Sequence, residues 1–200
     1  MKLPEKSQLL IEHLSRRILV LDGAMGTSLQ DMNLTAADFG GEPYLGCNEY
    51  LNITAPDAIE TVHRKFIEAG ADIVESNTFG ATPLVLAEYD ISHLVYDINY
   101  KAVEIAKRAG IPFETSQRPQ FVAGSIGPTT KALSVTGGVT FDELADHFEQ
   151  QAIPLIEAGA DYLLLETAID TLNLKAAYIG ISSRCCSKNG SSLIFSHLIF

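Results

Sequence analysis

The sequence is poor in basic residues and in cysteine, and it contains no long apolar run. Lysine and arginine number 14 against 25 acidic residues, which gives a formal net charge of −11. Such a charge repels phosphate groups, so neither nucleic acid nor an anionic membrane surface is an expected partner. No segment approaches the ~20 apolar residues that span a bilayer, and the charged amino end does not read as a signal peptide. We therefore expect a cytoplasmic protein.

The three cysteines are too few and too badly spaced for a disulfide framework. Cys185 and Cys186 are adjacent, and adjacent cysteines rarely pair without strain. We expect reduced thiols, with Cys47 either a small buried residue or an exposed loop thiol. The sequence also lacks GxSxG, HExxH, Walker and GxGxxG motifs. Serine hydrolase, zincin and dinucleotide-binding chemistry therefore have no support.

Short apolar runs alternate with longer amphipathic ones along the 200 residues, which is typical of parallel βα units. The pattern predicts strands at residues 18–21, 72–75, 121–123 and 162–165. It predicts helices over residues 6–15, 54–69, 92–109 and 140–158. Two of these helices are expected to begin with a capping box, formed by Thr54 with Asp57 and by Thr140 with Glu143.

An internal repeat relates two of the predicted strands. Residues 68–78 (EAGADIVESNT) and 157–167 (EAGADYLLLET) align without a gap. The alignment places Asn77 opposite Glu166, and Thr78 opposite Thr167, at the carboxyl ends of their strands. Barrels and doubly wound sheets of the α/β class build their sites at these ends.

The spacing of the units favours an α/β fold, namely a partial (β/α)8 TIM barrel of about the first four βα units. A complete barrel needs ~250 residues. Residues 1–181 are assigned to this partial barrel, and residues 182–200 to a divergent tail that loses helical periodicity. The tail is interpreted as the end of a truncated or altered reading frame, or as an unpaired fifth strand. The open sheet edges of half a barrel call for cover by another chain.

The predicted strand tips carry Asp22, Asn77, Ser125 and Glu166. Residues 21–27 (LDGAMGT) form a glycine turn whose N–H groups can converge on an anion, although Asp22 capping its own turn is an alternative. Glu166 alone would suggest a solvated or helix-capping residue. Two carboxylates, an amide and backbone donors on one rim instead suit a zwitterionic amino acid. Residues 125–130 (SIGPTT) add a third turn at this level, or are only a loop.

Four ordered segments carry a family resemblance: residues 21–27, 46–82, 123–129 and 157–171. Together they resemble the homocysteine S-methyltransferases, and within that family the amino-terminal homocysteine-binding domain of cobalamin-dependent methionine synthase. The resemblance covers residues 16–181. It implies a barrel in which zinc binds the homocysteine sulfur as a thiolate, which then attacks the methyl group of methylcobalamin.

The resemblance also implies roles for six residues. Asp22 and Glu166 match the acids that hold the homocysteine ammonium group. The backbone around Gly26 and Thr27 matches the cradle for its carboxylate. Asn77 and Thr78 match the second strand tip lining the pocket.

The zinc ligands of the family have no counterpart here. They are a cysteine after the sixth strand and an adjacent pair in a GGCCG segment after the eighth, which correspond to positions beyond residue 200. Cys185 and Cys186 lack flanking glycines and a third ligand, so we assign them no metal. The histidines offer no substitute, because His13, His63, His93 and His147 are interpreted as surface residues of charged helical stretches.

The sequence thus predicts an amino-terminal fragment of a homocysteine methyltransferase that acts in methionine biosynthesis and is inactive alone. Its expected partners are homocysteine and the missing barrel half or other modules of the synthase. One alternative is a non-catalytic half-barrel for binding or assembly. Another is an S-methylmethionine-dependent enzyme, which needs no cobalamin.

Overall fold

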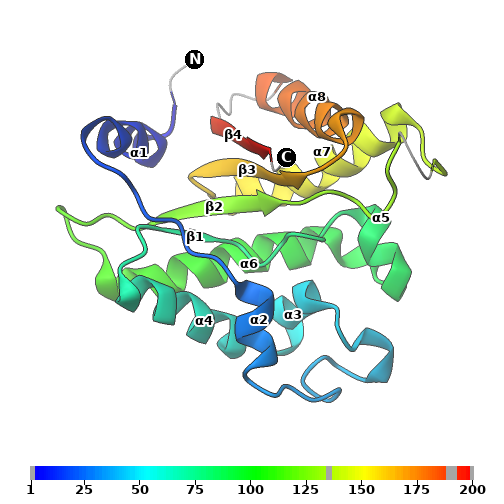
Figure 1. Ribbon diagram of the computed structural model, residues 1–200, viewed down its shortest axis with the longest axis horizontal. Helices are drawn as coiled ribbons and strands as arrows, with labels where there is room; N and C mark the ends of the chain where they lie inside the picture. Colours follow the sequence, from blue (N-terminus) through cyan, green and yellow to red (C-terminus); the bar gives the residue numbers. More distant parts are fainter. Residues whose placement is uncertain (1–2, 134–136, 188–192, 199–200) are drawn as a thin grey trace.

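The computed structural model describes residues 3–133, 137–187 and 193–198. Its strands form one parallel sheet in the order β1 (Ile73–Glu75), β2 (Phe121–Ile126), β3 (Tyr162–Ala168) and β4 (Leu193–Leu198). Strands that follow one another along the chain are neighbours in the sheet, and every pair is parallel. Helices connect them, as Figure 1 shows. This order is that of consecutive units of a (β/α)8 barrel, so the predicted fold class is confirmed.

The α-helices are α1 (Glu5–Arg16), α2 (Met25–Gln30), α3 (Leu51–Thr54), α4 (Pro56–Ala69), α5 (Pro83–Leu86), α6 (Val95–Gly110), α7 (Phe141–Glu157) and α8 (Thr171–Ser187). Short 3-10 helices lie at η1 (Glu42–Tyr44), η2 (Asn48–Tyr50), η3 (Ala87–Tyr89), η4 (Ser92–Leu94) and η5 (Ile111–Phe113). Within the described ranges, no helix has the length and apolar character needed to cross a membrane.

One of the two predicted capping boxes is present. The Thr140 hydroxyl accepts from the Glu143 amide at 3.2 Å, and the Glu143 carboxylate accepts from the Thr140 amide at 2.8 Å. The box predicted at Thr54 is wrong, because α4 begins two residues later at Pro56. The Thr54 hydroxyl instead donates to the Tyr50 carbonyl in the preceding short helix. Proline at the first helical turn starts α4 without a side-chain cap.

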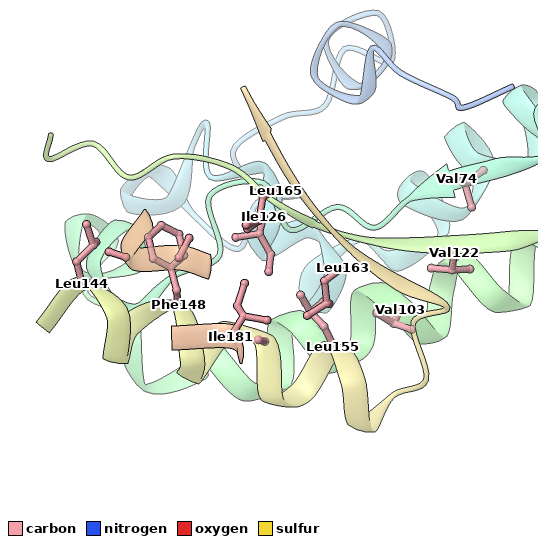
Figure 2. Close-up of a cluster of buried hydrophobic side chains, with 14 of the residues drawn as sticks. Val74, Val103, Val122, Ile126, Leu144, Phe148, Leu155, Leu163, Leu165 and Ile181 are labelled. Atoms are coloured by element: carbon pink, nitrogen blue, oxygen red, sulfur yellow. The ribbon is translucent and has the colours of Figure 1, made fainter. Parts of the chain in front are cut away.

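The two faces of the sheet carry different apolar layers. Outward-pointing residues such as Val74, Val122 and Leu163 pack against the α6, α7 and α8 side chains drawn in Figure 2. Inward-pointing residues form a second cluster with Leu10 of α1, which lies on the opposite side of the sheet from α4 and α6 (Figure 1). The members contributed by the sheet are Ile73, Phe121, Ala123, Tyr162 and Leu164. Alternate residues along β1, β2 and β3 therefore face the barrel interior.

Residues 18–21 run alongside β1 without forming a regular strand, which corrects the predicted first strand. They are joined to it by a single bridge between Leu21 and Ile73. The amides of Asp72 and Ile73 both donate to the Val20 carbonyl, at 2.8 and 3.1 Å. Two donors on one carbonyl interrupt the regular spacing of a parallel ladder. The segment nonetheless delivers Asp22 to the carboxyl end of β1.

The described residues beyond position 181 continue a helix and form a strand. Helix α8 continues past residue 182 to Ser187, and β4 pairs in parallel with β3. The sequence predicts a loss of helical periodicity at residue 182, but helix α8 does not end there. The tail was interpreted in part as an unpaired fifth strand, and the pairing of β4 with β3 corrects this. The proposed division after residue 181 falls within α8.

An ion pair between Arg17 and Asp72 holds residues 17–20 against the start of β1. Both terminal nitrogens of Arg17 donate to the Asp72 carboxylate at 2.8 Å, and the Val20 amide donates to the same group at 2.9 Å. Burial raises the pKa of Asp72, but these hydrogen bonds outweigh it and hold the pKa below its usual value. The ionised carboxylate therefore stabilises the fold.

We expect Asp72→Asn to lower the free energy of unfolding by about 1–2 kcal/mol at pH 7, since Arg17 is partly exposed and solvent weakens the pair. Because the pKa is lowered on folding, this stabilisation is present above pH ~4 and is lost as the pH falls further. Urea unfolding of both proteins between pH 7 and pH 3 measures it. A difference that grows toward pH 3 would contradict the assignment.

Candidate active site

The carboxyl ends of the strands meet at one cavity of about 340 Å³. It is lined by Asp22, Gly23, Ala24, Met25, Gly26, Asn48, Glu49, Glu75, Ser76, Asn77, Thr78, Phe79, Ser125 and Glu166. The inward face of the sheet changes from apolar residues at its amino end to Glu75, Ser125 and Glu166 at this end. The pocket thus lies above the apolar interior cluster, at the position where barrels of this class carry their sites.

Asp22 is fixed at the pocket by the neighbouring strand. Its Oδ1 accepts from the Glu75 amide at 2.8 Å, and its own amide donates to the Ile73 carbonyl at 3.0 Å. The side chain is 4% exposed. The second carboxylate oxygen of Asp22, Oδ2, is available for contact with a ligand or with His63.

Glu166 enters the pocket from the end of β3. Its Oε1 accepts from the Ser125 hydroxyl at 2.5 Å. The pairing of β3 with β4 shifts register between Leu165 and Ala168, and Thr167 adopts a left-handed φ of 53°. This irregularity is of the kind that re-aims a side chain next to a functional site.

Asn77 and Thr78 line the pocket, but their polar groups already bind other parts of the chain. The Asn77 amide donates to the Asn48 carbonyl at 2.7 Å and to the Asn52 side chain at 3.1 Å. The Thr78 hydroxyl donates to the Ser125 carbonyl at 2.7 Å, and the Thr78 carbonyl accepts from Gln151 of α7 at 2.7 Å. These contacts shape the pocket wall and tie it to neighbouring elements.

The glycine turn supplies Gly26 to the pocket but not Thr27. Ala24, which precedes α2, adopts a left-handed φ of 53°, so the chain turns sharply after Asp22. Gly26 then faces the cavity. Thr27 is exposed, and its hydroxyl donates to the Ala24 carbonyl at 3.2 Å. Thr27 is not among the residues that line the cavity.

Glu75 is the pocket residue that sequence patterns left unnoticed. It was counted as part of a buried strand, yet it lies two residues after the inward-facing Ile73 and so shares its face. Burial, the negative charges of Glu166 and Asp22, and a hydrogen bond to Glu166 raise its pKa to about 8. At neutral pH this carboxyl is mostly protonated, whereas free glutamic acid is ionised.

Glu49 is a second buried acid that sequence reasoning missed. It comes from η2, and its Oε1 accepts from the Gly80 amide at 2.8 Å. Burial raises its pKa, while the hydrogen bond from Gly80 acts in the opposite direction. Its place in a loop between predicted elements gave no periodic signal that it faces inward.

His63 is fully buried, which overturns its interpretation as a surface residue. It projects from α4 toward the pocket, and its Nδ1 lies 3.8 Å from Oδ2 of Asp22. Neither ring nitrogen forms a hydrogen bond with any of the described residues. Charged neighbours in the sequence suggested exposure, but His63 occupies the apolar stripe of α4 beside Val62. His93 is exposed, as predicted, while His13 and His147 are half-buried.

The described residues do not fit a zinc site. No group of three or more histidine, cysteine, aspartate or glutamate side chains among them is arranged to hold a metal ion. The pocket offers carboxylates but no thiol or imidazole on its lining, whereas zinc prefers nitrogen and sulfur ligands. Cys47 is buried in a separate apolar cluster, and burial raises its pKa to about 11. It is therefore the small buried residue of the two alternatives, and the side chains of Cys185 and Cys186 lie outside the described part.

Comparison with known proteins places the chain among methyltransferases. The family model described as homocysteine S-methyltransferase matches residues 19–195. Two proteins named methionine synthase, from Mycobacterium leprae (strain TN) and from Mycobacterium tuberculosis (strain ATCC 25618 / H37Rv), are 43% identical over 190 residues. The match covers 94% of this chain, but only 15% and 16% of theirs.

Solved structures support the same fold. The homocysteine methyltransferase MmuM from Escherichia coli superposes with a TM-score of 0.72 in both its oxidised and its metallated form. Sequence identity is 23%, and the match covers 90% and 88% of this chain and 62% of each MmuM chain. The architecture is therefore part of a TIM barrel, as the strand order indicates.

Proposed function

Because this chain belongs to the homocysteine S-methyltransferase family, we propose that the pocket beyond β1, β2 and β3 binds homocysteine for methylation of its sulfur. The observation that carries the proposal is the convergence of Asp22 and Glu166 on one cavity. Two acids that line one small pocket favour a ligand with an ammonium group. The pocket volume of about 340 Å³ is of the size that small-molecule sites have.

The residues take the following parts in this proposal. Asp22 and Glu166 hold the ammonium group through charge-assisted hydrogen bonds. Backbone amides of the turn around Gly26 receive the carboxylate, with Thr27 contributing through its backbone, because its hydroxyl already donates to the Ala24 carbonyl. Asn77 and Thr78 act by holding the pocket wall in place.

The whole reaction belongs to a longer protein than this chain. The chain spans about 15% of the methionine synthases it matches and 62% of MmuM. We propose that it is the first part of the homocysteine barrel, in cytoplasmic methionine biosynthesis, and that residues elsewhere complete the metal centre. Methylcobalamin and zinc enter the proposal only for that longer protein, because the described residues offer zinc no ligand set. This chain alone is expected to bind homocysteine without methylating it.

Calorimetric titration of the chain with L-homocysteine tests the proposal. We expect saturable binding of one molecule per chain. The matched ligand 4-mercaptobutyrate keeps the thiol and the carboxylate but lacks the ammonium group, and should bind much more weakly. Equal affinity for both ligands would show that the two acids do not recognise an ammonium group, and no binding of either would refute the proposed function.

A further inference from the structure

Glu75 lines the same pocket as Asp22 and Glu166. The proposed function assigns roles to Asp22 and Glu166 but none to Glu75. Its side chain faces the barrel interior from the last residue of β1. Its backbone amide donates to Asp22, so the two residues are held next to each other. Of the four carboxyl groups that line this cavity, those of Asp22, Glu75 and Glu166 interact with one another, and they do not all carry a charge without a cation between them.

A proton on Glu75 reduces the repulsion between these negative charges in the empty pocket. A protonated Glu75 carboxyl can donate to Glu166, whose Oε1 accepts from the Ser125 hydroxyl. Asp22 and Glu166 each accept a hydrogen bond, Asp22 from the Glu75 amide and Glu166 from the Ser125 hydroxyl. Burial of Glu75 and the negative charges of Glu166 and Asp22 favour the same protonated form, because both raise the pKa of Glu75.

We propose that Glu75 is a third substrate-recognition residue, protonated when the pocket is empty, and that the ammonium group of a bound α-amino acid displaces its proton to solvent. The carboxylic acid O–H bond breaks, the carboxylate remains beside the ammonium group, and the proton leaves to the buffer. No other reactant is required. This inference rests on the proposed function, since it takes an amino acid as the ligand.

The other groups around Glu75 determine how its proton responds to a ligand. The titratable side chains that face it or the adjoining pocket are Asp22, Glu166, Tyr162, Glu49 and, behind Asp22, His63. Burial and the nearby acids raise the pKa of Tyr162, so its phenol stays neutral. Glu49 accepts from Gly80 on another wall of the cavity. No lysine or arginine is among the residues that line the cavity, so the ligand itself supplies the cation.

Proton release on binding is measurable with L-methionine, which has the same ammonium and carboxylate groups as homocysteine but no thiol to ionise. Titration calorimetry in buffers of different ionisation enthalpy counts the protons released. An ammonium group at close range lowers the pKa of a carboxyl by about 1–3 units, so we expect about 0.4–0.9 proton released per molecule at pH 7. The affinity should rise about 3–20-fold from pH 6 to pH 7.5.

Glu75→Gln provides the decisive comparison, because glutamine has nearly the same shape and carries no titrating proton. The release should fall to nearly zero, and the affinity should become flat over this pH range. Glu68→Gln is the matched control, since it removes one charge from an exposed position of α4 and should leave the release unchanged. Release that survives Glu75→Gln, or that disappears in Glu49→Gln instead, overturns the proposal.

A second measurement separates this proposal from the proposed function. In the chain labelled with carbon-13 in glutamate side chains, one carboxyl resonance should titrate near pH 8, and Glu75→Gln should remove it. If Glu75 titrates near its ordinary value of ~4.3, the proposal is wrong even where amino acids bind. If amino acids bind without releasing protons, it is wrong while the proposed function stands. If neither amino acid binds, the release and the proposed function fail together.

Discussion

L-Homocysteine binding should fall by at least about 100-fold when Asp22→Asn and Glu166→Gln are combined. Each substitution removes one charge-assisted hydrogen bond to the ammonium group, worth about 1.5–3 kcal/mol, and each 1.4 kcal/mol is a tenfold change in Kd. The amide of asparagine still offers an oxygen to the Glu75 amide, so the fold around the pocket is retained. Calorimetry measures the affinities, and circular dichroism verifies the fold.

The single variants show whether the two acids act on the same group. We expect each alone to weaken binding about 10–100-fold, with a combined loss that departs from the product, because both contact one ammonium group. Glu68→Gln removes one charge from the surface of α4 and should bind L-homocysteine with the affinity of the wild type. Wild-type affinity in the double variant would show that the ligand lies elsewhere.

Gly180→Ala is expected to lower the free energy of unfolding by about 3 kcal/mol, the upper end of the range for overpacking. A Cβ at Gly180 overlaps the carbonyl oxygen of Ala145, and α8 packs closely on α7 at this point. A backbone carbonyl within a helix has no alternative rotamer, so the two helices have to separate. Thermal unfolding should show a decrease in Tm of roughly 6–12 °C for a chain of this size.

Gly23→Ala is the matched control for this substitution. It adds the same methyl group to a glycine with nothing within 4 Å of the new Cβ and with no left-handed backbone angle. Its stability should lie within about 0.5 kcal/mol of the wild type. Equal Tm values for both variants would show that α7 and α8 do not contact each other as closely as described.

The fold was predictable where local signals and packing agree. Continuous apolar runs identified β2 and β3, and the Thr140 capping box marked the start of α7. The start of α4 was placed too early, because Thr54 suited a cap but Pro56 determined where the helix begins. Residues 18–21 are apolar enough for a strand, yet the doubled hydrogen bonding at Val20 is a property of the tertiary arrangement.

The site was predictable only in part, because sequence patterns show where a strand ends and not what its side chains meet. Asp22 and Glu166 follow apolar runs directly, so their shared rim was visible. Glu75 is a charged residue inside a strand, and its inward direction depends on the pleat of β1 relative to Ile73. His63 lies among charged neighbours, and only the packing of α4 against the strand reveals that it is buried.

The buried hydrogen bond from Gln151 to the Thr78 carbonyl has a mechanical consequence. Widening the pocket at Thr78, beyond the end of β1, either moves helix α7 as well or leaves a buried polar group without its partner, at a cost of about 1–3 kcal/mol. The cavity wall is thereby pre-organised, and a ligand that fits it loses little affinity to rearranging the protein. Molecules too long for the cavity are excluded, because this wall does not move easily to admit them.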